Sequence, residues 1–168
     1  MHILAHISYP YILANLVAFF MDIKIPWEYN LLIVLFSLFP DIDVAVDFIK
    51  QLFSKGKYDL PPKHHQNATH WPIVYVPLLA LALITMEPFF LIAVSAIYLH
   101  LFMDIFYCSQ GVMIFYPFST KWYYLLSDKT KNKDGWEWNK TYKKLKIYTI
   151  DRWAFFIILT HLAIIMII

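Results

Sequence analysis

Apolar and polar residues gather in long blocks along this chain, and the lengths of the apolar blocks predict membrane helices. Five apolar stretches stand out, at residues 3–21, 25–39, 71–86, 89–107 and 153–168. A helix needs about 20 apolar residues to cross a bilayer, with a range of roughly 17–25. Several of these stretches lie at or just below that limit. The pattern therefore predicts an all-α fold, a polytopic membrane helical bundle of four to five transmembrane helices.

The connections between the stretches predict how the helices are oriented. A short turn containing Pro26 joins the first two stretches, and Glu87 and Pro88 alone separate the third from the fourth. Each pair therefore forms a hairpin whose outer ends return to the same side of the membrane. That side is expected to carry the N-terminus, the loop 41–70 and the loop 119–152.

The basic residues predict which side of the membrane faces the cytoplasm. Of the fourteen Lys and Arg residues, only Lys24 lies in a turn on the opposite side. Cytoplasmic loops carry an excess of Lys and Arg, so the side with the remaining basic residues is predicted to be cytoplasmic. We expect one integral membrane domain over residues 1–168 in the plasma membrane. Within it, residues 119–152 are expected to form a basic cytoplasmic loop before the last helix.

Composition agrees with this interpretation and excludes several other classes of protein. The 168 residues are 60% hydrophobic and 15% charged, whereas soluble domains are roughly 45–50% apolar and about 25% charged. The net charge of +2 is too small to predict a nucleic-acid partner, so membrane lipids are the expected partners. The single Cys108 excludes an internal disulfide and a zinc site made of cysteines alone. The N-terminal stretch lacks a basic segment and a small-residue cleavage site, and is expected to be a retained helix.

Residues that commonly bind metals lie at the predicted cytoplasmic ends of the helices. The topology follows from hydropathy and basic residues alone, and it nevertheless brings these side chains to one face of the membrane. The candidate metal ligands are His6, Asp41, Asp43, His65, His70, His100 and Asp104.

Two pairs within this set have an informative spacing. His100 and Asp104 are four residues apart, so they share one face of a helix. Ionisable residues inside an apolar helix are costly unless they face the bundle interior and meet a partner. Asp41 and Asp43 are two residues apart and diverge, so one is expected to bind a metal while the other bridges or orients a ligand.

The histidines before the third apolar stretch complete the predicted site. His65 and His70 are five residues apart and do not share a helix face. Pro72 suits the first turn of a helix, so the two histidines are expected to converge from a loop at the helix entry. Neutral imidazoles combined with carboxylates suit Zn²⁺, Mn²⁺ or Fe²⁺. Seven candidate ligands leave room for two or more ions, most plausibly zinc.

Structural roles are the alternative for each of these residues. His100 and Asp104 could form a hydrogen-bonded pair that supports packing, and Asp41 and Asp43 could cap a helix. His161 lies within the last apolar stretch and is expected to pack between helices or make an interhelical hydrogen bond. The lysine-rich segment 121–146 could face solvent near anionic lipid, or could steer an anionic headgroup to the site.

At these positions the chain resembles the YdjM-like family of membrane-bound metal-dependent hydrolases. The family pattern is an early His, then L-P-D-x-D, H-R-G-x-T-H, Y-x-x-H-x-x-x-D and G-[VI]-x-x-x-x-P. The corresponding residues here are His6, Pro40-Asp41-Ile42-Asp43, His65 to His70, His100 with Asp104, and Gly111-Val112 with Pro117. The resemblance covers residues 1–119. Gln66 and Asn67 replace the Arg-Gly of the pattern, and Tyr98 is one residue closer to His100 than usual.

The resemblance implies a wider similarity to zinc-dependent phospholipase C and related nucleases, which cleave phosphoesters with clustered zinc ions held by His and Asp. The expected function is hydrolysis of a phosphoester or phospholipid by metal-activated water at the cytoplasmic face. Its catalytic set is Asp41, Asp43, His65, His70, His100 and Asp104, with His6 as a further metal ligand. The alternative is a metal-binding membrane protein without hydrolase activity, such as a transporter, a sensor or a catalytically inactive interaction protein.

Overall fold

The computed structural model describes residues 3–53, 64–107, 111–124, 142–144 and 146–167. Its helices are α1 (Ile3–Phe20), α2 (Trp27–Ser37), α3 (Ile42–Phe53), α4 (Val76–Thr85), α5 (Pro88–Tyr107) and α7 (Lys146–Ile167). Short 3-10 turns lie between them at η1 (Phe39–Asp41), η2 (His64–Gln66), η3 (Ala68–His70) and η4 (Pro72–Tyr75). Within the described ranges, β pairing is limited to one bridge between Val112 and Tyr123.

The prediction of an all-α membrane bundle is confirmed. Three segments are long and apolar enough to cross a membrane, namely Ile3–Phe20, Pro88–Phe106 and Lys146–Ile165. The second apolar stretch qualifies as a fourth only when Trp27–Ser37 and Phe39–Val46 are taken together, across a bend of 43°. The third stretch gives the shorter apolar helix Pro72–Thr85. The described residues therefore contain three candidate spans, or four with the bent pair, against the predicted four to five.

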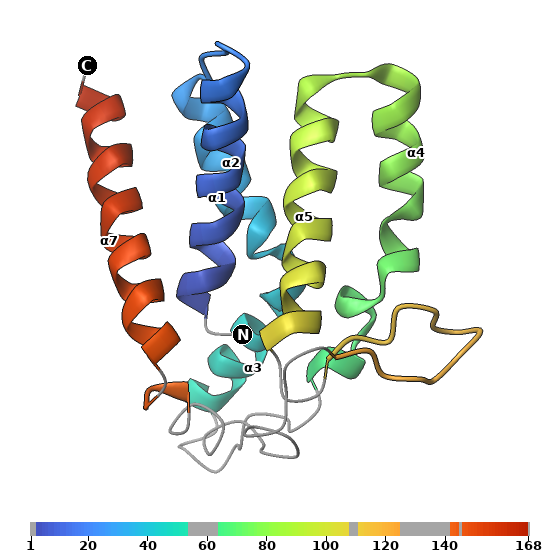
Figure 1. Cartoon of the computed structure of the whole chain (residues 1–168). Helices are drawn as coiled ribbons and strands as arrows, with labels where there is room; N and C mark the ends of the chain where they lie inside the picture. The colour runs from blue at the N-terminus through green and yellow to red at the C-terminus, as the bar shows by residue number, and fades with distance from the viewer. Residues whose placement is uncertain (1–2, 54–63, 108–110, 125–141, 145, 168) are drawn as a thin grey trace.

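The two predicted hairpins are present and have the same orientation. Figure 1 shows α1 and α2 joined at the end of the bundle where α5 is joined to α4. At the other end lie the start of α1, helix α3 across the base of the bundle, and the end of α5. The segments that carry the candidate ligands therefore meet at one end of the bundle.

The bend after α2 has a local cause in the sequence. Helix α2 ends at Ser37, and Pro40 lies within the following 3-10 turn. Proline lacks a backbone N–H and its ring disfavours helix at the preceding residue, so a straight α-helix cannot continue here. The chain turns at η1, which contains Asp41 and contacts α5, and then enters α3.

Polar side chains join the helices within an otherwise apolar interior. Asn15 on α1 donates a 2.8 Å hydrogen bond to Asn30 on α2. Tyr11 on α1 lies 2.6 Å from Nδ1 of His161 on α7, so the interhelical hydrogen bond predicted for this histidine is confirmed. Such contacts stabilise helix pairs in membranes by about 0.6 kcal/mol on average.

Helix α7 begins earlier than the apolar pattern predicts. It begins at Lys146, whereas the last apolar stretch begins at Trp153. The added turns are held by the buried Asp151, whose carboxylate accepts hydrogen bonds from Tyr9 on α1 and from Tyr142. The last part of the predicted loop 119–152 is therefore helical, while residues 125–141 and 145 lie outside the described residues.

Candidate metal centre

Six of the seven predicted ligands come together at the base of the bundle. They form three overlapping groups, and within each group the candidate ligand atoms lie within 4.8 Å of one another. The groups are His6 with His100 and Asp104, Asp41 with His70 and His100, and His65 with His70 and Asp104. The donor set is four imidazoles and two carboxylates, drawn from α1, η1, η2, η3 and α5.

Asp104 lies at the centre of this cluster. Its Oδ1 is 3.1 Å from Nε2 of His6, and its Oδ2 is 3.2 Å from Nε2 of His100 one helical turn earlier on α5. The same Oδ2 lies 3.8 Å from Nε2 of His70 and 3.9 Å from Nε2 of His65. The i, i+4 spacing predicted that His100 and Asp104 share a helix face, and the structure confirms it.

Asp41 approaches the cluster from the 3-10 turn after α2. Its Oδ1 is 3.4 Å from Nε2 of His70 and 3.7 Å from Nε2 of His100. Two ligands that each lie about 2.05 Å from a tetrahedral ion are roughly 3.3 Å from one another. The shorter separations in this cluster, from 3.1 to 3.4 Å, fit ligands that share an ion.

The outward-facing nitrogens of three histidines are held by hydrogen bonds. Nδ1 of His100 donates to the backbone oxygen of Ser37 over 2.6 Å, and Nδ1 of His65 donates to that of Gly111 over 2.9 Å. Nδ1 of His70 lies 3.2 Å from the hydroxyl of Thr69. A proton on Nδ1 leaves the lone pair of Nε2 available for a metal, and such contacts are typical of the surroundings of metal-bound histidines.

The remaining ring contacts also favour neutral imidazoles. The rings of His6 and His100 are stacked with centroids 3.7 Å apart, and those of His65 and His70 are stacked at 4.6 Å. Two protonated rings at these distances would repel one another. Nε2 of His100, which faces Asp104, is buried and has no hydrogen-bond partner among the residues that the structure describes. A buried nitrogen of this kind is costly unless it meets a further group, and a metal ion would be one.

Burial of the cluster also favours neutral histidines. All four histidines and Asp104 are at most 1% exposed, while Asp41 is 15% exposed. Burial lowers the pKa of His70, which lies outside the membrane-spanning segments, below its usual value. A histidine that stays neutral at neutral pH is ready to bind a metal. Asp41 is the member of the cluster through which solvent has access.

Asp43 lies outside the three groups, unlike the other six predicted ligands. Its Oδ1 accepts a 2.8 Å hydrogen bond from the backbone N–H of Val44, and its Oδ2 accepts a 2.5 Å hydrogen bond from the side chain of Asn67. Asn67 occupies the position of the glycine in the family pattern. The hydrogen bond from Asn67 to Asp43 therefore connects the start of α3 with the loop that carries His65 and His70.

Two backbone carbonyls that support the site could not be identified from residue types. The carbonyl of Ser37 holds His100, and that of Gly111 holds His65. Any residue offers a carbonyl, so no sequence signal points to Ser37, whereas Gly111 belongs to the family pattern. The side chain of His64, together with Lys63, lies outside the described residues.

Of three comparisons with known proteins, the one with family models found a match. A search of curated proteins and a search of solved structures each found no match. The family model described as YdjM inner membrane protein matches residues 1–168, the whole of the sequence. The candidate membrane spans agree with that description. On this match, the chain belongs to the YdjM inner membrane protein family.

Proposed function

We propose that this protein is a metal-dependent hydrolase that cleaves a phosphoester at the cytoplasmic face of the membrane. The observation that carries the proposal is the convergence of four imidazoles on two carboxylates in a buried cluster. A divalent ion bound there would act as a Lewis acid towards a phosphoryl oxygen and would lower the pKa of a coordinated water to about 7.

The donor set supports more than one ion. The two oxygens of Asp104 face different histidines, with Oδ1 next to His6 and Oδ2 next to His65, His70 and His100. A carboxylate with this arrangement can bridge two ions. Imidazole with carboxylate ligation suits zinc, with manganese or iron as alternatives.

The accessible side of the cluster supports a route for substrate and water. Asp41 is the partly exposed ligand. Asp43 follows it two residues later and accepts a hydrogen bond from Asn67. A phosphoester that enters here would meet Asp41 first. Asp41 is also placed to accept a proton from an attacking water, because its carboxylate is the partly exposed one of the cluster.

The position of the cluster favours hydrolysis over transport. Transport sites commonly lie near the bilayer midplane between broken helices. Here the ligands gather at one end of the bundle, near the start of α1 and the end of α5.

Gln66 and Asn67 occupy the Arg-Gly positions of the family pattern, so the arginine that could bind phosphate is missing. A divalent ion held by the cluster would then supply the positive charge that binds the phosphate.

The test is elemental analysis of detergent-purified protein, followed by a phosphodiesterase assay with bis(p-nitrophenyl) phosphate. We expect stoichiometric zinc, manganese or iron in the wild type, and loss of both metal and activity in Asp104→Ala. The matched control is His161→Ala, which removes a histidine that contacts Tyr11 on α1, away from the cluster, and should keep its metal.

Two results would overturn the proposal. One is a wild-type protein that binds none of these ions after reconstitution. The other is an Asp104→Ala variant that keeps full phosphodiesterase activity. Bound metal without hydrolysis of any phosphoester would instead support a structural or sensory metal site.

A further inference from the structure

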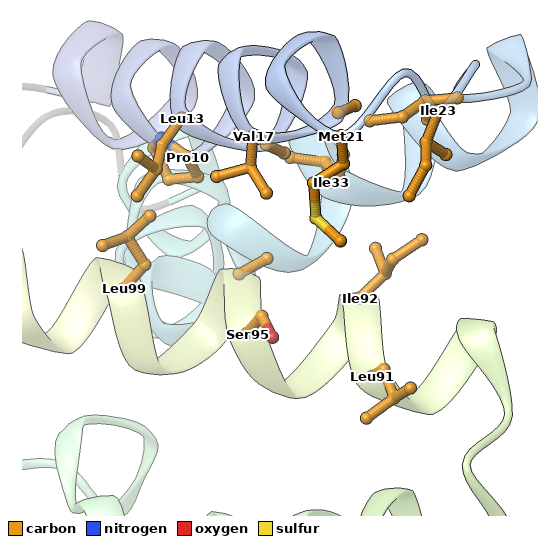
Figure 2. Close-up of a pocket in the computed structure, with 14 residues that line it drawn as sticks. Pro10, Leu13, Val17, Met21, Ile23, Ile33, Leu91, Ile92, Ser95 and Leu99 are labelled. Atoms are coloured by element: carbon orange, nitrogen blue, oxygen red, sulfur yellow. The ribbon is translucent and has the colours of Figure 1, made fainter.

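An apolar groove runs along the membrane-facing side of the bundle between α1 and α5, with α2 behind it. Figure 2 shows Leu13 and Val17 on α1 opposite Ser95 and Leu99 on α5, with Ile33 of α2 between them. The cavity has a volume of about 430 Å³, within the range of roughly 300–1,000 Å³ that small-molecule sites occupy. All but Ser95 of its fourteen lining residues are apolar.

The groove is open to its surroundings along one side. Leu13, Val17 and Met21 are between 45% and 63% exposed although they line it. Its two walls, α1 and α5, both qualify as membrane spans, so those surroundings are lipid. A dry, apolar cavity that opens into lipid takes a hydrocarbon group more readily than water.

The length of the groove matches a hydrocarbon chain. At a rise of about 1.5 Å per residue, the distance from Pro10 to Met21 along α1 is about 16 Å. The hydrocarbon core of a bilayer is about 30 Å thick, so the chains of one leaflet extend about 15 Å. One lipid chain would therefore fill the groove from end to end.

The lower end of the groove adjoins the metal centre. Pro10 lies one helical turn after His6 on α1, and Ala96 lies one turn before His100 on α5. His6 and His100, whose rings are stacked and buried, are therefore the ligands nearest to the groove along α1 and α5. Both imidazoles face Asp104 through Nε2. A chain in the groove would bring its polar end against the cluster.

We propose that this groove holds the hydrocarbon chain of a lipid phosphoester whose phosphate lies at the metal centre. This assignment of the substrate class rests on the proposed hydrolase function. The position of this apolar groove, one helical turn from two buried metal-type ligands, distinguishes it from the ordinary lipid contacts of a membrane helix. The groove selects the substrate by its chain, and the cluster acts on its phosphate.

The test compares two matched variants of α1. Leu13 and Leu16 are 45% and 48% exposed, but only Leu13 lines the groove. Leu13→Trp therefore fills the groove, while Leu16→Trp adds the same side chain to the neighbouring lipid-facing surface. Ser95→Phe fills the groove from α5, so a folding defect in one variant leaves the other informative.

The readout that does not depend on hydrolysis is crosslinking by a phosphatidylglycerol that carries a photoreactive group at the end of one chain. In wild type and Leu16→Trp we expect crosslinks concentrated on α1 and α5 residues of the groove. In Leu13→Trp and Ser95→Phe they should fall about tenfold, the change that corresponds to lost burial of about two methylene groups. Asp104→Ala should lose hydrolysis and keep the crosslinks.

The second readout is hydrolysis of a long-chain phospholipid beside bis(p-nitrophenyl) phosphate. Leu13→Trp should slow cleavage of the phospholipid and leave cleavage of the soluble diester unchanged. Two results would overturn the assignment. One is a set of crosslinks spread evenly over all lipid-facing helices, and the other is a groove without crosslinks because another protein helix occupies it. Concentrated crosslinks without hydrolysis of either compound would refute the hydrolase function and leave the groove as a lipid-chain site.

Discussion

Gly111 connects the segment 111–124 to the metal centre, and a methyl group added there should weaken metal binding from outside the ligand set. The residue has a φ of +73°, which L side chains rarely adopt. A Cβ at this position would overlap the carbonyl oxygen of Tyr123 and lie 2.8 Å from the carbonyl carbon. These are backbone atoms on the bridge between Val112 and Tyr123, so they cannot move aside as a flexible side chain would.

The size of the effect has two parts. The left-handed conformation alone costs an alanine about 1–2 kcal/mol, and the overlap must be relieved by shifting the backbone. That shift would move the Gly111 carbonyl, which accepts the 2.9 Å hydrogen bond from Nδ1 of His65. Loss of such a supporting contact typically reduces metal affinity by roughly 10–100-fold. We therefore expect Gly111→Ala to weaken metal binding within this range.

The assay is competition between the protein and a chelator of known zinc affinity, measured beside the thermal unfolding midpoint. Phe118→Ala is the control, because this side chain is in the same segment and is 85% exposed. Its metal affinity should equal that of the wild type. If Gly111→Ala unfolds earlier but binds metal normally, the segment does not position His65 and the reasoning is refuted.

Three further predictions test other parts of the structure. Asp41→Asn should lose most of the bound metal and Asp43→Asn should keep it, because only Asp41 lies near two imidazoles; equal metal contents would contradict this. Tyr9→Phe removes a 2.8 Å hydrogen bond to Asp151. It should lower the free energy of unfolding in detergent by about 1–2 kcal/mol, while an unchanged unfolding midpoint would show that this contact contributes nothing. Burial lowers the pKa of His70 below its usual 6.5, so the unfolded chain takes up the proton first. The metal-free protein should therefore lose stability as the pH falls below about 6.5, and a stability that rises on acidification would have the wrong sign.

The sequence predicted the bundle and the grouping of ligands because both follow from local patterns. The lengths of the apolar stretches predicted the helices, and the short turns at Pro26 and Glu87-Pro88 predicted the hairpins. Once the hairpins are oriented, every candidate ligand lies at the same end. The i, i+4 spacing of His100 and Asp104 then fixed their shared face without further information.

Other features depend on contacts that no spacing reveals. Asp41 and Asp43 are equivalent in the sequence, and they differ only because the 3-10 turn directs Asp41 inward while Asn67 binds Asp43. The early start of α7 likewise depends on Asp151 and its two tyrosine partners. The groove between α1 and α5 could not be predicted either, because its lining residues follow the same sequence pattern as any apolar helix.

The origin of the cluster in four separate parts of the chain gives metal a part in assembly. His6 begins the first helix, Asp41 follows the second, His65 and His70 precede the fourth, and Asp104 ends the fifth. Ions bound by the three overlapping groups would close several long loops at once. The loop-closure entropy grows only slowly with loop length, so distant ligands cost little more to join than near ones. Metal supply during membrane insertion would then decide how much of the chain reaches its native packing, and α7, which contributes no ligand among the described residues, could dock afterwards.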